Sequence, residues 1–187
     1  DAVTQLIEAY LTRRSNPVTD ALCLEGLRLS FREEAGETAV VKAVEEPTSR
    51  PARERMAQAA LLSGMALANS GLVTTHGVAA ALGVHCRAAH GLACAVMLPA
   101  ALRLNRDSCR DRFDRMARIC LEHRGLPSSE SARIDAFLQH VENVVTRIGI
   151  PRRLSEIGVR APQIPDIVRS SRGNSMSGNP REIGDDE

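Results

Sequence analysis

The apolar residues of this sequence recur with the spacing of an α-helix, and no segment convincingly alternates between apolar and polar residues as a strand would. Within residues 1–14, for example, one helical stripe consists of Val3, Leu6, Ile7 and Tyr10. The chain has no tryptophan, one tyrosine and three phenylalanines, so its core has to be built from Ala, Leu, Val, Ile and Met. Such a core favours closely packed helices over aromatic-rich strands. The pattern predicts an all-α helical bundle.

Helix boundaries follow from caps and prolines. Asn16 can cap a helix whose first position is Pro17, and Pro99 should kink a later helix. The stretch from residue 32 to Pro51 is polar, a turn is expected near Gly83, and the elements beyond residue 151 are short. We expect helices over residues 1–14, 17–31, 51–68, 74–82, 90–104, 107–121 and 131–148.

Charge and cysteine content exclude several classes of function. The formal net charge of +1 gives no general attraction for nucleic acid or anionic lipid, and the arginines between Arg103 and Arg124 alternate with acids as on a solvated helix face. The five cysteines form no CxxC pair. With no signal peptide and no apolar run long enough to cross a bilayer, the sequence predicts a reduced, cytoplasmic setting without membrane or nucleic-acid partners.

Two histidines stand in apolar surroundings and invite a ligand role. His76 and His90 lie on apolar helices, where an imidazole needs a partner. Asp1 and Gln5 are spaced i,i+4, so their side chains share a helix face. One carboxylate, one amide oxygen and two imidazoles could bind a divalent ion. Spacing alone leaves the ordinary reading open, in which the histidines are hydrogen-bonded core residues and Asp1 caps a helix.

Other candidates are weaker. His85, Cys86 and Cys94 form a rival thiolate cluster, but their spacing matches no zinc finger or ribbon. His123 and His140 lie in polar contexts and are expected at the surface. No nucleophile elbow, P-loop or GxGxxG motif is present, so the sequence contains no nucleotide-phosphate site of a known type.

Several motifs together resemble a known family. The chain begins Asp1-Ala-Val-Thr-Gln-Leu-Ile-Glu-Ala-Tyr10, continues with Asn16-Pro-Val-Thr-Asp-Ala21, and later carries Asn69-Ser-Gly-Leu-Val-Thr-Thr-His76, His90-Gly-Leu-Ala-Cys-Ala-Val-Met-Leu-Pro99, Ile148-Gly-Ile-Pro-Arg-Arg-Leu-Ser-Glu-Ile-Gly-Val159 and Asn179-Pro-Arg181. In order and spacing these resemble the helical C-terminal domain of iron-containing alcohol dehydrogenases, which have the dehydroquinate synthase-like fold. The resemblance covers essentially the whole chain.

The resemblance implies a two-domain oxidoreductase in which an N-terminal α/β domain binds NAD or NADP and the helical domain binds the catalytic metal, usually iron and sometimes zinc. Carried over by position, the metal ligands are Asp1, Gln5, His76 and His90. Gln5 replaces a histidine of the family, Ala80 stands where many members have a histidine implicated in proton relay, and Ala89 replaces a proline. The acidic run Asp185-Asp186-Glu187 resembles a helix start without its body. We therefore expect residues 1–187 to be one domain truncated at both ends, without its nucleotide-binding partner domain.

The function implied is hydride transfer between a small alcohol, or its aldehyde or ketone, and NAD(P), with the metal polarising the substrate oxygen. Two alternatives stay open: a metal-independent enzyme such as a maleylacetate reductase, and a stand-alone helical fragment without catalysis. The fragment alone is expected to be inactive. Neither the substrate nor the oligomeric state follows from the sequence, and a homo-oligomer remains among the expected partners.

Overall fold

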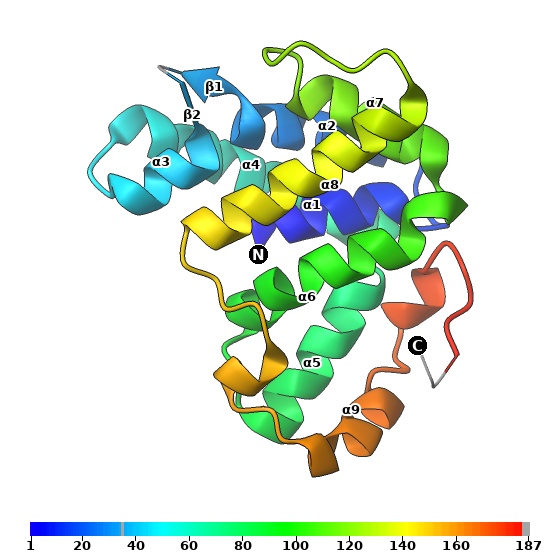
Figure 1. The fold of residues 1–187 in the computed structure, drawn as a ribbon. Coiled ribbons are helices and arrows are strands. Elements are labelled where there is room, and N and C mark those ends of the chain that lie inside the picture. Colours follow the sequence, from blue (N-terminus) through cyan, green and yellow to red (C-terminus); the bar gives the residue numbers. More distant parts are fainter. Residues whose placement is uncertain (35, 185–187) are drawn as a thin grey trace.

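The computed structural model describes residues 1–34 and 36–184, and their helices form two groups that meet near the N-terminus (Figure 1). The larger group contains α1 (Ala2–Leu11), α2 (Pro17–Phe31), α3 (Ala39–Glu45), α4 (Arg50–Ser70), α7 (Arg110–Cys120) and α8 (Glu130–Arg147), with a hairpin of β1 (Glu33–Glu34) and β2 (Glu37–Thr38). The smaller group contains α5 (Thr74–Cys86), α6 (His90–Asn105) and α9 (Ile164–Ser170), with short 3₁₀ turns around them. The all-α prediction is confirmed.

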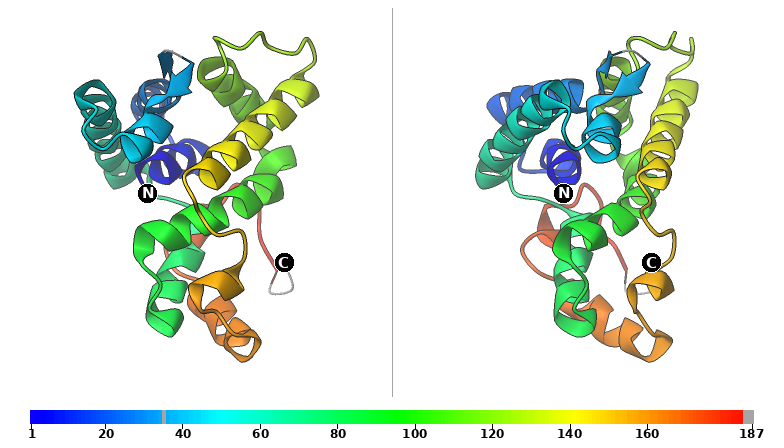
Figure 2. Two further views of the ribbon diagram at one scale, coloured as in Figure 1. Left: turned by 60° about the vertical axis from the view of Figure 1, so that its left-hand side comes forward. Right: turned by 90° about the vertical axis from the view of Figure 1, so that its left-hand side faces the viewer.

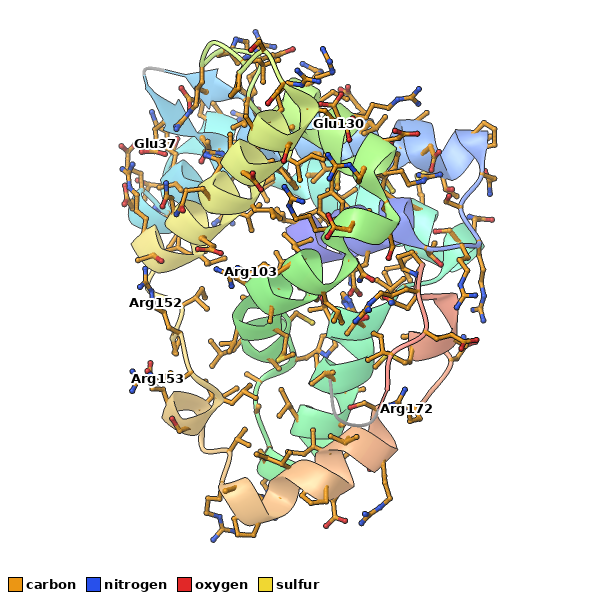
Figure 3. The ribbon with its side chains drawn as sticks, turned by 45° about the vertical axis from the view of Figure 1, so that its right-hand side comes forward. Glu37, Arg103, Glu130, Arg152, Arg153 and Arg172 are labelled. Carbon is orange, nitrogen blue, oxygen red and sulfur yellow. The ribbon has the colours of Figure 1, made fainter. Side chains whose placement is uncertain are left out.

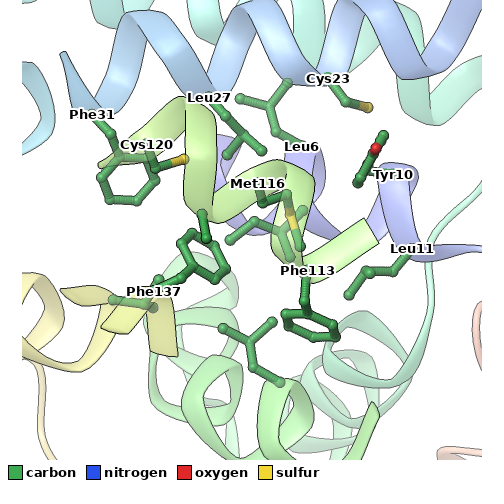
Figure 4. Close-up of a cluster of buried hydrophobic side chains, with 14 of the residues drawn as sticks. Leu6, Tyr10, Leu11, Cys23, Leu27, Phe31, Phe113, Met116, Cys120 and Phe137 are labelled. Atoms are coloured by element: carbon green, nitrogen blue, oxygen red, sulfur yellow. The ribbon is translucent and has the colours of Figure 1, made fainter. Parts of the chain in front are cut away.

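The larger group packs around α1, and its core uses every aromatic residue of the chain (Figure 4). Tyr10, Phe31, Phe113 and Phe137 are each at most 1 % exposed. The rings of Phe113 and Phe137 meet edge to face, with centroids 6.4 Å apart. Gly26 lets α2 approach α1, because a Cβ at this position would lie 2.5 Å from a methyl group of Leu6. Close packing of this kind fixes the orientation of α1.

The smaller group has a core of its own between α5, α6 and α9, built largely from small side chains such as Ala79, Ala93 and Cys94. The two further views show α5 and α6 side by side below α1, so that the N-terminal ends of these helices approach one another (Figure 2). Because α6 also contributes Leu98 and Leu102 to the larger core, it joins the two groups.

The C-terminal segment fastens the ends of several helices. The backbone oxygen of Gly178 accepts hydrogen bonds from the Thr12 hydroxyl and the Arg13 amide, just beyond α1. Asn179 bonds Thr74 at the start of α5 and exchanges two bonds with Asn105 at the end of α6. A Cβ at Gly178 would lie 2.7 Å from the Thr12 hydroxyl oxygen, so the close approach requires glycine.

Most predicted helix boundaries agree with the structure. The cap at Asn16 is present, with the side chain accepting from the amides of Val18 and Thr19. The expected kink residue Pro99 lies inside α6, and the elements beyond Pro151 are short. The first helix ends at Leu11, three residues before the predicted end.

Two predictions about local structure were wrong. The polar stretch contains the β1–β2 hairpin and α3, whose Ala39 and Val41 are buried against the rest of the fold. This helix has only seven residues, so its apolar stripe is too short to recognise. The expected turn at Gly83 lies inside α5, which ends only where Arg87 adopts a left-handed conformation at φ 53°. The predicted helix start at residues 185–187 falls outside the described residues.

The arginine-rich stretch is largely a surface feature, as predicted. Arg103 pairs with Glu142 and Arg110 with Glu130, and Figure 3 shows Arg103 and Glu130 on the outside of their helices. Arg112 differs: its guanidinium stacks on a buried aromatic ring, 4.4 Å from the ring centroid. Within residues 1–34 and 36–184, no single helix is apolar and long enough to cross a membrane; α4 and α5 qualify only as a pair bent by 98°.

Candidate metal centre

Three of the predicted site residues meet where the N-terminal ends of α1, α5 and α6 converge. Asp1 Oδ1 lies 3.1 Å from Nε2 of His76 and 3.8 Å from Nε2 of His90. The two imidazole rings are tilted, with centroids 5.4 Å apart. His76 is buried, whereas the side chains of Asp1 and His90 are 36 % and 53 % exposed. The site is therefore closed on the side of α5 and open on the side of α6.

A residue that sequence reasoning missed holds His76 in place. The carboxylate of Glu8, 1 % exposed, lies 2.7 Å from Nδ1 of His76. A carboxylate only accepts, so the ring donates from Nδ1 and its Nε2 is directed at Asp1. Glu8 also accepts from the backbone amides of Val73, Thr75 and His76, which are the free donors at the start of α5.

The fourth predicted ligand, Gln5, has other partners. Its amide nitrogen donates to Asp1 Oδ2 at 3.0 Å, and its amide oxygen accepts from the Ser63 hydroxyl at 2.8 Å. The group facing Asp1 must be the NH₂, because a carboxylate cannot donate to an amide oxygen. Gln5 thus orients the Asp1 carboxylate, and its oxygen is directed toward α4.

Cys94 is the second site residue that sequence reasoning missed. Its sulfur lies 3.7 Å from Nε2 of His90, one helical turn earlier on α6, and its side chain is fully buried. One ligating atom from each of Asp1, His76, His90 and Cys94 lies within 4.8 Å of every other. The signal was present in the sequence, since residues i and i+4 share a helix face.

The rival cluster that linked Cys94 to His85 and Cys86 does not form a metal-binding group among the described residues. His85 lies near the end of α5, where its ring contacts the hydroxyl of Ser170 at 2.7 Å. All five cysteines are free.

The electrostatics of the site favour a positive charge. The pKa of His76 is raised to about 9: burial of the ring lowers it, but hydrogen bonds with Cys94 and Glu8 outweigh that effect. The pKa of His90 is lowered by burial, by the charge of His76 and by the α-amino group of Asp1. A proton on Nε2 of His76 points at Asp1, and a divalent cation can replace it there. The donor set, with oxygen, nitrogen and sulfur atoms, fits a divalent transition metal.

The surface prediction was correct for His123 but wrong for His140. His123 is exposed beside Glu122, whereas His140 on α8 is only 5 % exposed and packs on Phe31, with ring centroids 5.2 Å apart. Burial, assisted by the charge of Arg124, lowers the pKa of His140 to about 4. The polar neighbours of this residue lie on the outer face of α8, and the packing of that helix on α2 decides its burial.

Comparisons with known proteins decide the family. The sequence profile described as "Fe-containing alcohol dehydrogenase family, C-terminal" matches residues 1–187. The chain belongs to the iron-containing alcohol dehydrogenase family. Among its curated relatives are 1,3-propanediol dehydrogenase of Citrobacter freundii, 34% identical over 185 residues, and lactaldehyde reductase of Escherichia coli (strain K12), 31% identical over 186 residues. Each of these matches covers 97% of this chain and 46% of the relative.

A solved structure supports the same family assignment. The crystal structure of a 1,3-propanediol oxidoreductase superposes with a TM-score of 0.91 at 30% sequence identity, covering all of this chain and 47% of that protein. The chain therefore spans about half the length of the iron-containing alcohol dehydrogenases that it matches. The family implies a metal and NAD(P) in these enzymes.

Proposed function

We propose that this chain is the metal-binding half of an alcohol:NAD(P) oxidoreductase that interconverts a small alcohol and its aldehyde or ketone. One observation carries the proposal: Asp1, His76 and His90 come from three separate helices and place their ligating atoms at one point. Glu8 behind His76 is the outer partner that metal-binding histidines commonly have. We propose iron or zinc as the metal, with Gln5 completing the predicted ligand set or contacting substrate.

Each residue has a distinct task in this proposal. A bound divalent ion would supply Lewis-acid polarisation of the substrate oxygen. Glu8 fixes the His76 ring so that Nε2 faces the site, and Gln5 fixes the Asp1 carboxylate. The buried wall around His76 limits access of water, while the exposed edge at His90 leaves room for substrate.

The nicotinamide nucleotide has no counterpart in this half of the protein. No phosphate-binding glycine motif occurs in the sequence, so we propose that an additional domain of the natural polypeptide binds NAD(P) against the open side of the site. We place the protein in the cytoplasm, where free thiols stay reduced.

A metal-independent reductase is the second candidate, and one observation favours it. His76 already bonds Asp1 and Glu8, so the cluster is satisfied by a proton alone. Metal analysis of the purified protein separates the two candidates.

The test uses the protein expressed from its complete natural reading frame. We expect about one divalent ion per chain and alcohol-dependent NAD(P)H formation. His90→Ala should lose both, whereas His123→Ala, the same change at an exposed histidine outside the site, should keep both. Activity without bound metal would support the metal-independent candidate, and absence of alcohol oxidation in the metal-loaded protein would contradict the proposal.

A further inference from the structure

The most informative residue outside the predicted ligand set is Cys94. We propose that the Cys94 thiolate is the fourth protein ligand of the metal, so that the ligand set is one aspartate, two histidines and one cysteine. The inference rests on the proposed function, because it presupposes that Asp1, His76 and His90 bind a divalent ion.

The distances suit a tetrahedral ion. With bonds of about 2.1 Å to nitrogen and oxygen and about 2.3 Å to sulfur, neighbouring ligand atoms in a tetrahedron lie about 3.4–3.6 Å apart. The measured separations are 3.1 Å from Asp1 to His76, 3.8 Å from Asp1 to His90, and 3.7 Å from His90 to the sulfur of Cys94. No pair among the four atoms exceeds 4.8 Å. Shifts of a few tenths of an ångström complete the site.

Gln5 is the poorer fourth ligand in this structure. Its amide oxygen would have to give up the hydrogen bond from Ser63, and its amide nitrogen the bond to Asp1. The sulfur of Cys94 already lies against His90 and needs to break no bond to the backbone or to Gln5. On binding, the thiol releases its proton to water and the thiolate donates its electron pair to the ion.

The burial of Cys94 supports a role as ligand. Its side chain is fully buried at the inner wall of the site, while the opposite edge at His90 is open. A buried thiolate is costly unless a positive charge neutralises it, and a divalent ion at this point does so. The remaining open side leaves a place for substrate without displacing a protein ligand.

A thiolate changes which metal the site prefers. Carboxylate and imidazole ligands suit many divalent ions, whereas a thiolate favours softer ones. We therefore infer that this site binds Zn²⁺ in preference to Fe²⁺, and that it accepts Co²⁺ as a spectroscopic substitute with the same tetrahedral arrangement.

The experiment is cobalt substitution in the metal-free protein expressed from its complete natural reading frame. The wild type should show an intense thiolate-to-cobalt charge-transfer band in the near ultraviolet. Cys94→Ser should lose that band, whereas Cys86→Ser, a matched change on α5 outside the site, should keep it. Gln5→Ala should keep the band as well.

Competition against a chelator gives a second readout. Cys94→Ser should weaken Zn²⁺ binding by at least about tenfold, the lower end of the loss caused by changing a mere outer partner of a ligand. Cys86→Ser should bind Zn²⁺ like the wild type. Far-ultraviolet circular dichroism checks that each variant is folded.

The outcomes separate the two proposals. If the wild type binds cobalt without the charge-transfer band, Cys94 is not a ligand, even if Cys94→Ser fails to fold. If Cys94→Ser retains band and affinity while His90→Ala loses cobalt, the ligand inference is overturned and the metal site stands. If His90→Ala also binds cobalt unchanged, the metal site itself is overturned.

Discussion

Replacing the buried carboxylate of Glu8 by an amide should destabilise the fold more than any exposed charge change. In the structure Glu8 accepts hydrogen bonds from three backbone amides at the start of α5 and from the ring of His76. Glu8→Gln keeps the size of the side chain. It replaces one acceptor oxygen with an NH₂ that meets another donor, and it removes a negative charge from a helix N-terminus.

The cost can be worked out from these contacts. Loss of one hydrogen bond to a charged group costs about 1.5–3 kcal/mol, and loss of the charge at the helix end costs about 1 kcal/mol. The free energy of unfolding should therefore fall by about 3 kcal/mol, which lowers the melting temperature of a chain of this size by about 10 °C. Glu25→Gln is the matched control, since Glu25 pairs with Arg28 at the surface and its loss should cost less than about 1 kcal/mol.

The assay is urea and thermal denaturation of the 187-residue chain, followed by circular dichroism with a chelator present. The chelator ensures that any difference comes from hydrogen bonding and charge rather than from bound metal. If Glu8→Gln and Glu25→Gln unfold at the same midpoint, then Glu8 does not hold the start of α5 and the reasoning fails.

Three further predictions follow from other parts of the molecule. The 187-residue chain alone should not oxidise alcohols, because it lacks a nucleotide-phosphate site; alcohol-dependent NAD(P)H formation above that of His76→Ala would contradict this. The pKa of His140 is about 4 when folded and 6.5 ordinarily, so its contribution to stability is present above about pH 6.5 and is lost as the pH falls toward 4. His140→Gln should show a smaller loss of stability between pH 7 and pH 5 than the wild type, and an equal loss would refute the assignment. Gly178→Ala should cost about 1–3 kcal/mol in denaturation, because its Cβ meets the Thr12 hydroxyl, whereas Gly173→Ala has open space and should unfold at the wild-type midpoint.

The long helices were predictable because their physical signals are local. Apolar stripes, the Asn16 cap and the prolines are read within one segment, and they gave most boundaries to within a few residues. Helix α3 was not predictable, since seven residues show too little periodicity and its stability comes from burying Ala39 and Val41. The burial of His140 likewise depends on Phe31, more than a hundred residues away.

The site was predictable in part. Asp1, His76 and His90 were named through the family resemblance, and the spacing of these residues alone left their role open. Glu8 lies in the apolar stretch of α1, but nothing local indicates that the start of α5 would face it. Cys94 carried a local signal, its i+4 spacing from His90, which became meaningful only when the structure placed both beside Asp1.

The bonds from Gly178 to Thr12 and Arg13 also bear on the order in which the chain assembles. They join residues 166 positions apart, so closing this contact costs on the order of 4–5 kcal/mol of chain entropy beyond the local terms. We expect the C-terminal segment to dock last during folding and to detach first during opening. Detachment would also free Thr74 from Asn179 and so expose the start of α5, the turn that presents His76 to the site. The binding centre would then loosen before the two cores come apart.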